Sequence, residues 1–213
     1  MNKKNYLLWQ VGEFFGKFAI IMFVISGAAL LTIHNRSLYQ FVLHRENLGQ
    51  HVGLSNEVVL KNYDILMSYM NNPFKEVLDM PDFPSSRQGL QHFAEVRVLF
   101  IFAIGVFIVS TLLGIWYVLR MRREKTYWKL INLGKISMVA PIVLGLMSVM
   151  MFNQIFYWFH RLLFRNDYWI YDPKVDPIIL VLPESYFLYC FLFFFIVVEV
   201  AFFLVYLKGK KSL

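Results

Sequence analysis

Four long apolar runs dominate the pattern of hydrophobic and polar positions along the chain. They cover, approximately, residues 14–33, 96–119, 136–158 and 186–207. Each contains about 20 or more mostly apolar residues, which is the length that a helix needs to cross a bilayer. Pro141 lies near the start of the third run, where a proline disturbs a helix least. The pattern predicts an all-α integral membrane four-helix bundle, with residues 1–213 forming a single membrane domain.

A long polar segment, about residues 34–95, joins the first run to the second. Within it, Ser55 can cap a helix over residues 56–70, whose apolar positions are spaced to form one side. This helix is too short and too polar to span a bilayer, so we expect it to lie at the membrane interface. Ser85 followed by Gln88 has the spacing of a capping box, which predicts the start of the long helix that enters the second run.

Basic residues flank the runs at both chain ends and between the second and third runs. They are Lys3, Lys4, Arg120, Arg122, Arg123, Lys125, Lys129, Lys135, Lys208, Lys210 and Lys211. These flanks fall on one side of a four-span chain, and lysine and arginine favour the cytoplasmic side of a membrane. We therefore expect both termini in the cytoplasm. The segments at about residues 34–95 and 159–185 then lie outside the cell, the first of them as a helical extracytoplasmic segment.

The composition agrees with a multi-pass protein of the cell membrane. The chain is 58% hydrophobic and 16% charged, whereas soluble domains carry about 25% charged residues. The formal charge of +7 comes from residues beside the apolar runs, so we expect membrane lipid as a partner and no nucleic acid. Cys190 is the single cysteine, which excludes an internal disulfide and a CxxC redox pair.

Two histidines on different predicted helices reach the outer boundary of the membrane. His92 lies about 40 Å along its helix from Arg120 at 1.5 Å per residue. By the same arithmetic, His160 lies about 36 Å from Ile136. Imidazole is the side chain best suited to take and return a proton near neutral pH, so the pair is a candidate for acid–base catalysis. The alternative is that each histidine is an amphipathic residue at the interface.

Polar side chains accompany both histidines. Glu95 follows His92 by three residues and shares its helix face, where it could orient the ring. The residues after His160 include Arg161, Asn166, Asp167, Trp169, Asp172 and Asp176. The alternative for this second group is a solvated loop in which the Asp-Pro pairs are turn residues.

A metal site and an intramembrane carboxylate also need to be considered. His92, Glu95, His160 and Asp167 could supply ligands, but HxxE is a weak pattern and no HExxH spacing is present, so we expect no metal and no cofactor. Glu199 lies inside the fourth run, at the expected depth of Lys17 and Glu13. An ionisable residue there is a functional candidate, but we favour an internal ion pair that fixes helix packing.

Two stretches of the chain resemble signatures of the lipoprotein intramolecular transacylase family of monoderm bacteria. The first runs from His92 to Phe100. The second runs from Phe159 to Trp169 and is followed by Asp172-Pro173, Asp176 and Pro183-Glu184. The four-span layout and the long outer segment match as well. Glu95 stands where Asp is expected to be common, which is a conservative departure.

The resemblance implies an acyltransferase that acts on the N-terminus of diacylglyceryl lipoproteins. It would move the sn-2 acyl chain to the α-amino group of the N-terminal cysteine and give a lyso-form lipoprotein. In this reaction His92 and His160 are the expected acid–base pair at the outer membrane face. Asn166 or Arg161 would stabilise the oxyanion, and Glu95 and Asp167 would orient the imidazoles.

Two other functions stay open from the residues alone. One is a metal-dependent membrane hydrolase or protease that uses His92, Glu95 and His160. The other is a non-enzymatic transporter or assembly subunit. Transporters often show repeat symmetry and broken helices at the bilayer midplane, whereas the polar residues of this chain gather at one surface.

Overall fold

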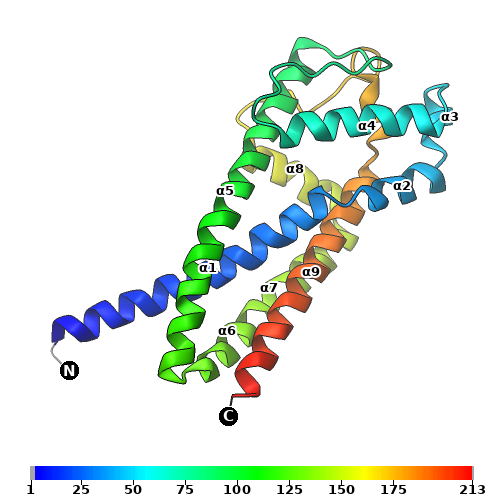
Figure 1. Cartoon of the computed structure of the whole chain (residues 1–213). Coiled ribbons are helices and arrows are strands. Elements are labelled where there is room, and N and C mark those ends of the chain that lie inside the picture. Colours follow the sequence, from blue (N-terminus) through cyan, green and yellow to red (C-terminus); the bar gives the residue numbers. More distant parts are fainter. Residues whose placement is uncertain (1–2, 213) are drawn as a thin grey trace. The chain divides into compact units, whose positions relative to one another are not determined.

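The computed structural model describes residues 3–212, apart from the side chains of residues 3–6 and 8. The described part is helical and contains no strand, which confirms the predicted all-α class (Figure 1). Its elements are α1 (Lys3–Ile33), α2 (Arg36–Arg45), α3 (Leu48–His51), α4 (Asn56–Asn71), α5 (Arg87–Glu124), η1 (Tyr127–Lys129), α6 (Leu130–Ser137), α7 (Val139–Met150), α8 (Phe152–Leu163), η2 (Pro177–Val181) and α9 (Glu184–Lys210). The side chains of Lys3 and Lys4, used above for orientation, lie outside the described residues.

Four helical stretches of the described residues are long and apolar enough to cross a membrane. They are Trp9–Ile33, Arg87–Glu124, Tyr127–Met150 and Glu184–Lys210. The number of predicted spans is therefore confirmed. The chain is a multi-pass membrane protein.

The third span differs from the expected range of 136–158. Its apolar stretch begins at Tyr127, ends at Met150 and is interrupted after Ser137. Pro141 explains the interruption, because it has no N–H to donate to the carbonyl of Ser137 and its ring crowds that carbonyl. The proline thus lies inside the span and divides it, rather than near its start.

The residues beyond Met150 form the separate helix α8. Its sequence alternates apolar and polar positions with a helical period, and its apolar residues include the exposed Trp158 and Leu162. His160 therefore belongs to a different helix from Ile136. The straight-helix arithmetic that placed it in the sequence analysis is wrong.

The chain forms two compact units. One contains the amino-terminal part up to Thr32, Ala103–Leu146 and the part from Phe193 onward. The other contains Ile33–Phe102 and Met147–Leu192. All of the site residues predicted from the sequence belong to the second unit.

The core of the second unit is built around α4. The predicted helix over 56–70 is confirmed, with the Ser55 hydroxyl accepting a hydrogen bond from the N–H of Val58 at 3.4 Å. Tyr63 of α4 stacks on Tyr39 of α2 at 3.7 Å between ring centroids, and both rings are buried. The Tyr39 hydroxyl donates to the carbonyl of Val181 at 2.9 Å. Protein therefore covers the apolar side of α4, which was expected to face the membrane interface.

In the first unit, no ion pair of Glu199 is present among the described side chains. The carboxylate of Glu13 lies 2.9 Å from the ammonium of Lys129 and 4.0 Å from that of Lys17. Within the described residues, Oε2 of Glu199 is buried without a hydrogen-bond partner. The prediction for Glu199 is wrong, because Lys17, the cation expected at its depth, lies beside Glu13 instead.

Candidate active site

The imidazoles of His92 on α5 and His160 on α8 lie close together in the second unit. Their ring centroids are 6.0 Å apart, and their planes are inclined by 34°. Both residues are buried, at 6% and 9% exposure. Among the described hydrogen bonds none joins the two rings.

Aromatic side chains surround this histidine pair. Phe164 lies 4.7 Å from His92 and 5.8 Å from His160, measured between ring centroids. Tyr171 contacts the His92 ring edge-on at 5.8 Å. Trp169 stacks on the His160 ring at 4.7 Å with an interplanar angle of 28°. These rings pack around the two imidazoles and limit their motion.

The hydrogen bond of His160 determines its tautomer. Nδ1 lies 2.7 Å from the carbonyl oxygen of Phe156, one turn earlier on α8. A carbonyl oxygen only accepts, so Nδ1 carries the proton and Nε2 of the neutral ring keeps its lone pair. Burial lowers the pKa of His160, and the hydrogen bond to Phe156 opposes this in part. The neutral ring with a basic Nε2 is the favoured form near neutral pH.

His92 lacks an orienting partner of the kind that was expected. Its Nδ1 is buried without a hydrogen-bond partner among the described residues. The Glu95 carboxylate, expected to orient the ring, instead accepts hydrogen bonds from the side-chain amide of Asn166 at 2.9 and 3.2 Å. The neighbouring aromatic rings hold His92 in place of a carboxylate.

Asn166 connects Glu95 to the stack on His160. Its backbone carbonyl accepts a hydrogen bond from the indole N–H of Trp169 at 3.1 Å. Its side-chain oxygen accepts from the N–H of Tyr168 at 3.1 Å. Hydrogen bonds and ring stacking therefore connect Glu95 to His160 through Asn166 and Trp169, and no described hydrogen bond joins Glu95 to His92.

Arg161 and Asp167 bond to each other at 2.8 Å. Both side chains are largely exposed, so this ion pair contributes little to stability. The expected role of Asp167 in orienting an imidazole stays a prediction, since the described hydrogen bond of its carboxylate comes from Arg161. Asp172 accepts a hydrogen bond from the N–H of Lys174 at 2.9 Å, as a turn residue does.

Asp176 is buried, and it holds the start of the helix that carries His92. Its carboxylate accepts hydrogen bonds from the N–H and the hydroxyl of Ser86, each at 2.7 Å. The Ser86 hydroxyl accepts in turn from the N–H of Gly89 at 2.9 Å. The helix is thus capped by Ser86, and the expected capping box of Ser85 and Gln88 is wrong by one residue.

Sequence reasoning named Trp169 but missed the other aromatic residues of the site. Phe156 and Phe164 lie four residues before and after His160, a spacing that places side chains together on a helix face. That spacing was a usable signal for Phe156 and for the last turn of α8. Tyr171 gave no such signal, because it lies in a loop that only the tertiary structure brings to His92.

The described residues show no group of three or more His, Cys, Asp or Glu side chains that could hold a metal ion. Of the four ligands considered from the sequence, Glu95 and Asp167 bond to Asn166 and Arg161. The donor set beside the two histidines does not fit a metal centre.

A sequence model of the family described as lipoprotein intramolecular transacylase Lit matches residues 14–187. The chain belongs to this family. A comparison with curated proteins finds no match. The family has an experimental structure, the in meso structure of the membrane integral lipoprotein intramolecular transacylase Lit from Bacillus cereus. It is 25% identical, with a TM-score of 0.90, over 95% of this chain and 94% of that chain.

Two variants of the same Bacillus cereus protein are also similar to this chain. One carries a histidine-to-arginine substitution and is 24% identical, with a TM-score of 0.83, over 100% of this chain and 96% of that chain. The other carries a histidine-to-alanine substitution and is 24% identical, with a TM-score of 0.82, over 98% and 96%. Membership of the family makes this chain a membrane acyltransferase of the lipoprotein intramolecular transacylase type, and the relative is consistent with a bacterial origin.

Proposed function

We propose that the chain moves the sn-2 acyl chain of a diacylglyceryl lipoprotein to the α-amino group of its N-terminal cysteine, giving a lyso-form lipoprotein. The observation that carries this proposal is a pair of buried imidazoles whose ring centroids are 6.0 Å apart. In one of them, His160, Nδ1 bonds to the Phe156 carbonyl and no described hydrogen bond involves Nε2. The transfer needs a proton taken from nitrogen and a proton given to oxygen, and two imidazoles suit this division.

The reaction balances without a cofactor or a second substrate. The α-ammonium first loses a proton to water, and the neutral amine attacks the carbonyl carbon of the sn-2 ester. A C–N bond forms, and the bond between that carbon and the sn-2 oxygen breaks. The nitrogen loses a second proton, and the sn-2 oxygen gains one to become a hydroxyl.

His160 suits the role of base. Its Nδ1 is occupied by the Phe156 carbonyl, so Nε2 is the nitrogen available to accept a proton from the attacking amine. Its lowered pKa keeps it neutral and ready to accept. His92 then relays that proton: one of its ring nitrogens donates to the sn-2 oxygen while the other accepts the proton that His160 took, so both rings end neutral.

Positioning contributes the rest of the rate. Both reacting groups belong to one substrate, so the site has to fold a flexible headgroup until the nitrogen meets the carbonyl carbon. The oxyanion that forms can be stabilised by Asn166 or Arg161. Each has a carboxylate partner already, so the oxyanion would compete with Glu95 or Asp167 for the donor.

The proposed orientation places this site at the outer face of the cell membrane, with both termini in the cytoplasm. Its support is the charge distribution, since the basic flanks fall on the side opposite to the segment that follows His160. Lipoproteins are exposed to the site at that face after their signal peptide has been removed.

The test is expression of the full chain in a cell whose lipoproteins carry two glycerol-linked acyl chains. Fragmentation of an N-terminal lipopeptide by mass spectrometry should then place one acyl group on the cysteine nitrogen, with one lost from glycerol and the total mass unchanged. His92→Ala and His160→Ala should each abolish the transfer, whereas His51→Ala, at an exposed position, should not.

Two outcomes contradict the proposal. Loss of one acyl chain from the peptide mass would indicate a hydrolase. Full acyl transfer by a membrane-inserted His92→Ala or His160→Ala variant would show that the two histidines do not act as an acid–base pair. Folding of each variant is checked by its yield and monodispersity in detergent.

A further inference from the structure

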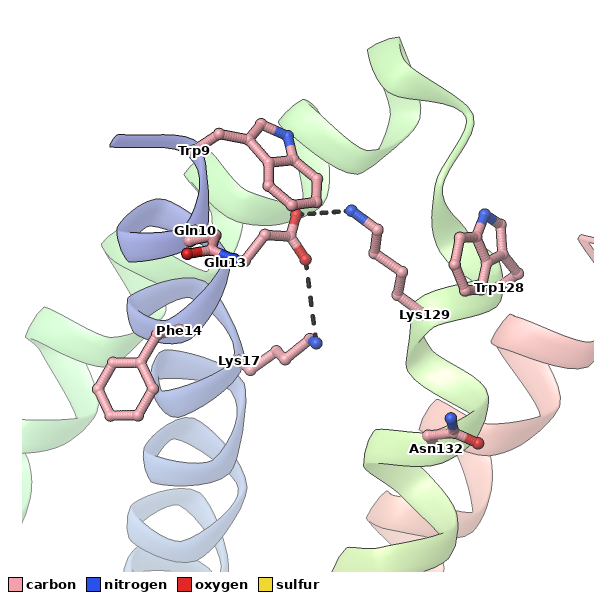
Figure 2. A pocket seen from close by; sticks show the side chains of 8 residues that line it. All are labelled: Trp9, Gln10, Glu13, Phe14, Lys17, Trp128, Lys129 and Asn132. Carbon is pink, nitrogen blue, oxygen red and sulfur yellow. Dashed lines mark ion pairs between the residues drawn. The ribbon is translucent and has the colours of Figure 1, made fainter. Parts of the chain in front are cut away.

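A second polar site lies in the first unit, remote in sequence from the two histidines. It is a cavity of about 450 Å³ lined by residues of α1, η1 and α6 (Figure 2). The α1 residues include Trp9, Glu13 and Lys17, and those of η1 include Trp128 and Lys129. The acyl-transfer chemistry uses none of these residues.

The carboxylate of Glu13 holds two ammonium groups at this cavity. Lys129 lies 2.9 Å from Oε1, and Lys17 lies 4.0 Å from Oε2. The hydroxyl of the buried Tyr117 donates to Oε2 at 3.1 Å. Figure 2 shows the two lysines pointing toward Glu13 from separate elements. The carboxylate thus keeps two positive charges together that would otherwise repel each other.

The cavity has one positive charge in excess, from two lysines and one glutamate. The Lys129 side chain is only 9% exposed, and its ammonium lies 4.2 Å from the centroid of a Trp9 ring. The Lys17 side chain is 41% exposed and stands at the far limit of ion-pair distance from Glu13. Lys17 therefore keeps donors available for an anion that enters the cavity.

The cavity lies at the ends of two membrane-spanning stretches. Trp9 is the first residue of the stretch Trp9–Ile33, and Trp128 is the second of Tyr127–Met150. Tryptophan favours the headgroup level of a bilayer. Phe14, at the cavity edge, and Trp128 are both exposed, so apolar surface adjoins the two ammonium groups. A ligand with an anionic head and an apolar body matches this arrangement.

We propose that this cavity binds the phosphate group of an anionic glycerophospholipid. The phosphate lies against the exposed ammonium of Lys17, beside the buried pair of Glu13 and Lys129, and the glycerol and acyl chains lie along Trp128 and Phe14. Basic pockets between transmembrane helices at the cytoplasmic side are places where anionic headgroups bind. With the orientation proposed above, this lipid belongs to the cytoplasmic leaflet, and its binding does not require acyl transfer.

The experiment measures lipid binding to the full chain by native mass spectrometry in detergent. Phosphatidylglycerol and phosphatidylcholine with the same acyl chains are titrated separately. The protein should retain one phosphatidylglycerol and bind phosphatidylcholine more weakly. At about a five-fold loss of affinity per basic residue near an anionic headgroup, Lys17→Gln should raise the dissociation constant about five-fold and Lys17→Gln with Lys129→Gln about 25-fold.

Two controls separate this site from general charge effects and from misfolding. Lys210→Gln removes an exposed lysine of the carboxyl-terminal flank and should leave the dissociation constant unchanged. Lys17→Gln leaves the 2.9 Å pair of Glu13 and Lys129 in place, so a folded variant is available even where the double variant fails to fold. Lys17→Arg keeps the charge and should retain the lipid.

Two results would overturn the proposal. Equal affinity of the wild type and of a folded Lys17→Gln variant for phosphatidylglycerol would show that the ion pairs only join the helices. Binding of inorganic phosphate in place of the lipid, with complete displacement at millimolar concentration, would assign the site to free phosphate.

Discussion

The carboxylate of Asp176 accepts hydrogen bonds from both the backbone N–H and the hydroxyl of Ser86, each at 2.7 Å. The two residues are 90 positions apart, and the contact joins the loop after α8 to the first turn of α5. Because His92 lies in the second turn of α5 and Tyr171 of that loop packs on its ring, this contact positions one histidine of the pair.

Asp176→Ala should lower both stability and activity. It removes two hydrogen bonds to a charged acceptor and leaves the Ser86 N–H without a partner, at a cost of about 3 kcal/mol. The thermal unfolding midpoint in detergent should fall, and acyl transfer should fall with it. Asp172→Asn is the matched control, because Asp172 is exposed and bonds only within its own turn. An unchanged unfolding midpoint for Asp176→Ala would contradict a stabilising role of the contact between Asp176 and Ser86.

Gly89→Ala should disturb the same contact from the other side. A Cβ at Gly89 would stand 2.4 Å from Oδ1 of Asp176, a distance at which the carboxylate must move. The expected result is a loss of activity similar to that of Asp176→Ala. Gly105→Ala, also within α5, meets nothing within 4 Å and should be neutral or stabilising by up to about 1 kcal/mol. Equal activity of Gly89→Ala and Gly105→Ala would show that the close approach of Asp176 to Gly89 does not affect the site.

The hydrogen bond between Glu95 and Asn166 can be tested by reversing it. Asn166→Asp places a second carboxylate about 3 Å from Glu95 and should cost about 2 kcal/mol, because the charged acceptors lose their donor. Adding Glu95→Gln restores a donor–acceptor pair with the opposite polarity. Activity should therefore drop in the single variant and recover in the double variant. Failure of the double variant to recover would mean that Asn166 has another role, such as the oxyanion donor.

His160 should stay able to accept a proton on the acid side of pH 6.5. It accepts a proton only when it is neutral, and burial lowers its pKa below the ordinary 6.5. Protonation of the substrate amine, with a pKa of about 7.7 to 8.0, lowers the rate first, and the second acid limb, which His160 sets, should lie below 6.5. Trp169→Leu removes the ring stacked on His160 and admits water, so the pKa should rise and the acid limb should move to higher pH.

Trp158→Leu is the control for this shift. Trp158 is on α8, the helix that carries His160, but its side chain is exposed. It should leave the acid limb where it is in the wild type. The measurement is the initial rate of acyl transfer in detergent between pH 5 and 8, in buffers of constant ionic strength. If the acid limb of Trp169→Leu lies at the same pH as that of the wild type, His160 is not the base that sets this limb.

The secondary structure was largely determined by local sequence. Apolar runs of about 20 residues have few alternatives to membrane-spanning helices, because the bilayer offers no partner for an unpaired backbone group. The helix after Ser55 could also be predicted, because its cap and the spacing of its apolar residues are both features of the local sequence. The break at Pro141 was visible in the sequence, but its effect depended on where the span began.

The composition of the site was accessible from the sequence, but its contacts were not. His92 and His160 could be chosen because the chain has 5 histidines and imidazole is the side chain best suited to proton transfer near neutral pH. The partners of Glu95, Asp167 and Asp176 could not be chosen, because each carboxylate had several donors within reach along the chain. Tertiary packing brought Asn166 to Glu95 and Ser86 to Asp176, because a buried or half-buried carboxylate accepts from the donor that the fold places beside it. The exposed Asp167 pairs with Arg161, six residues away along the chain.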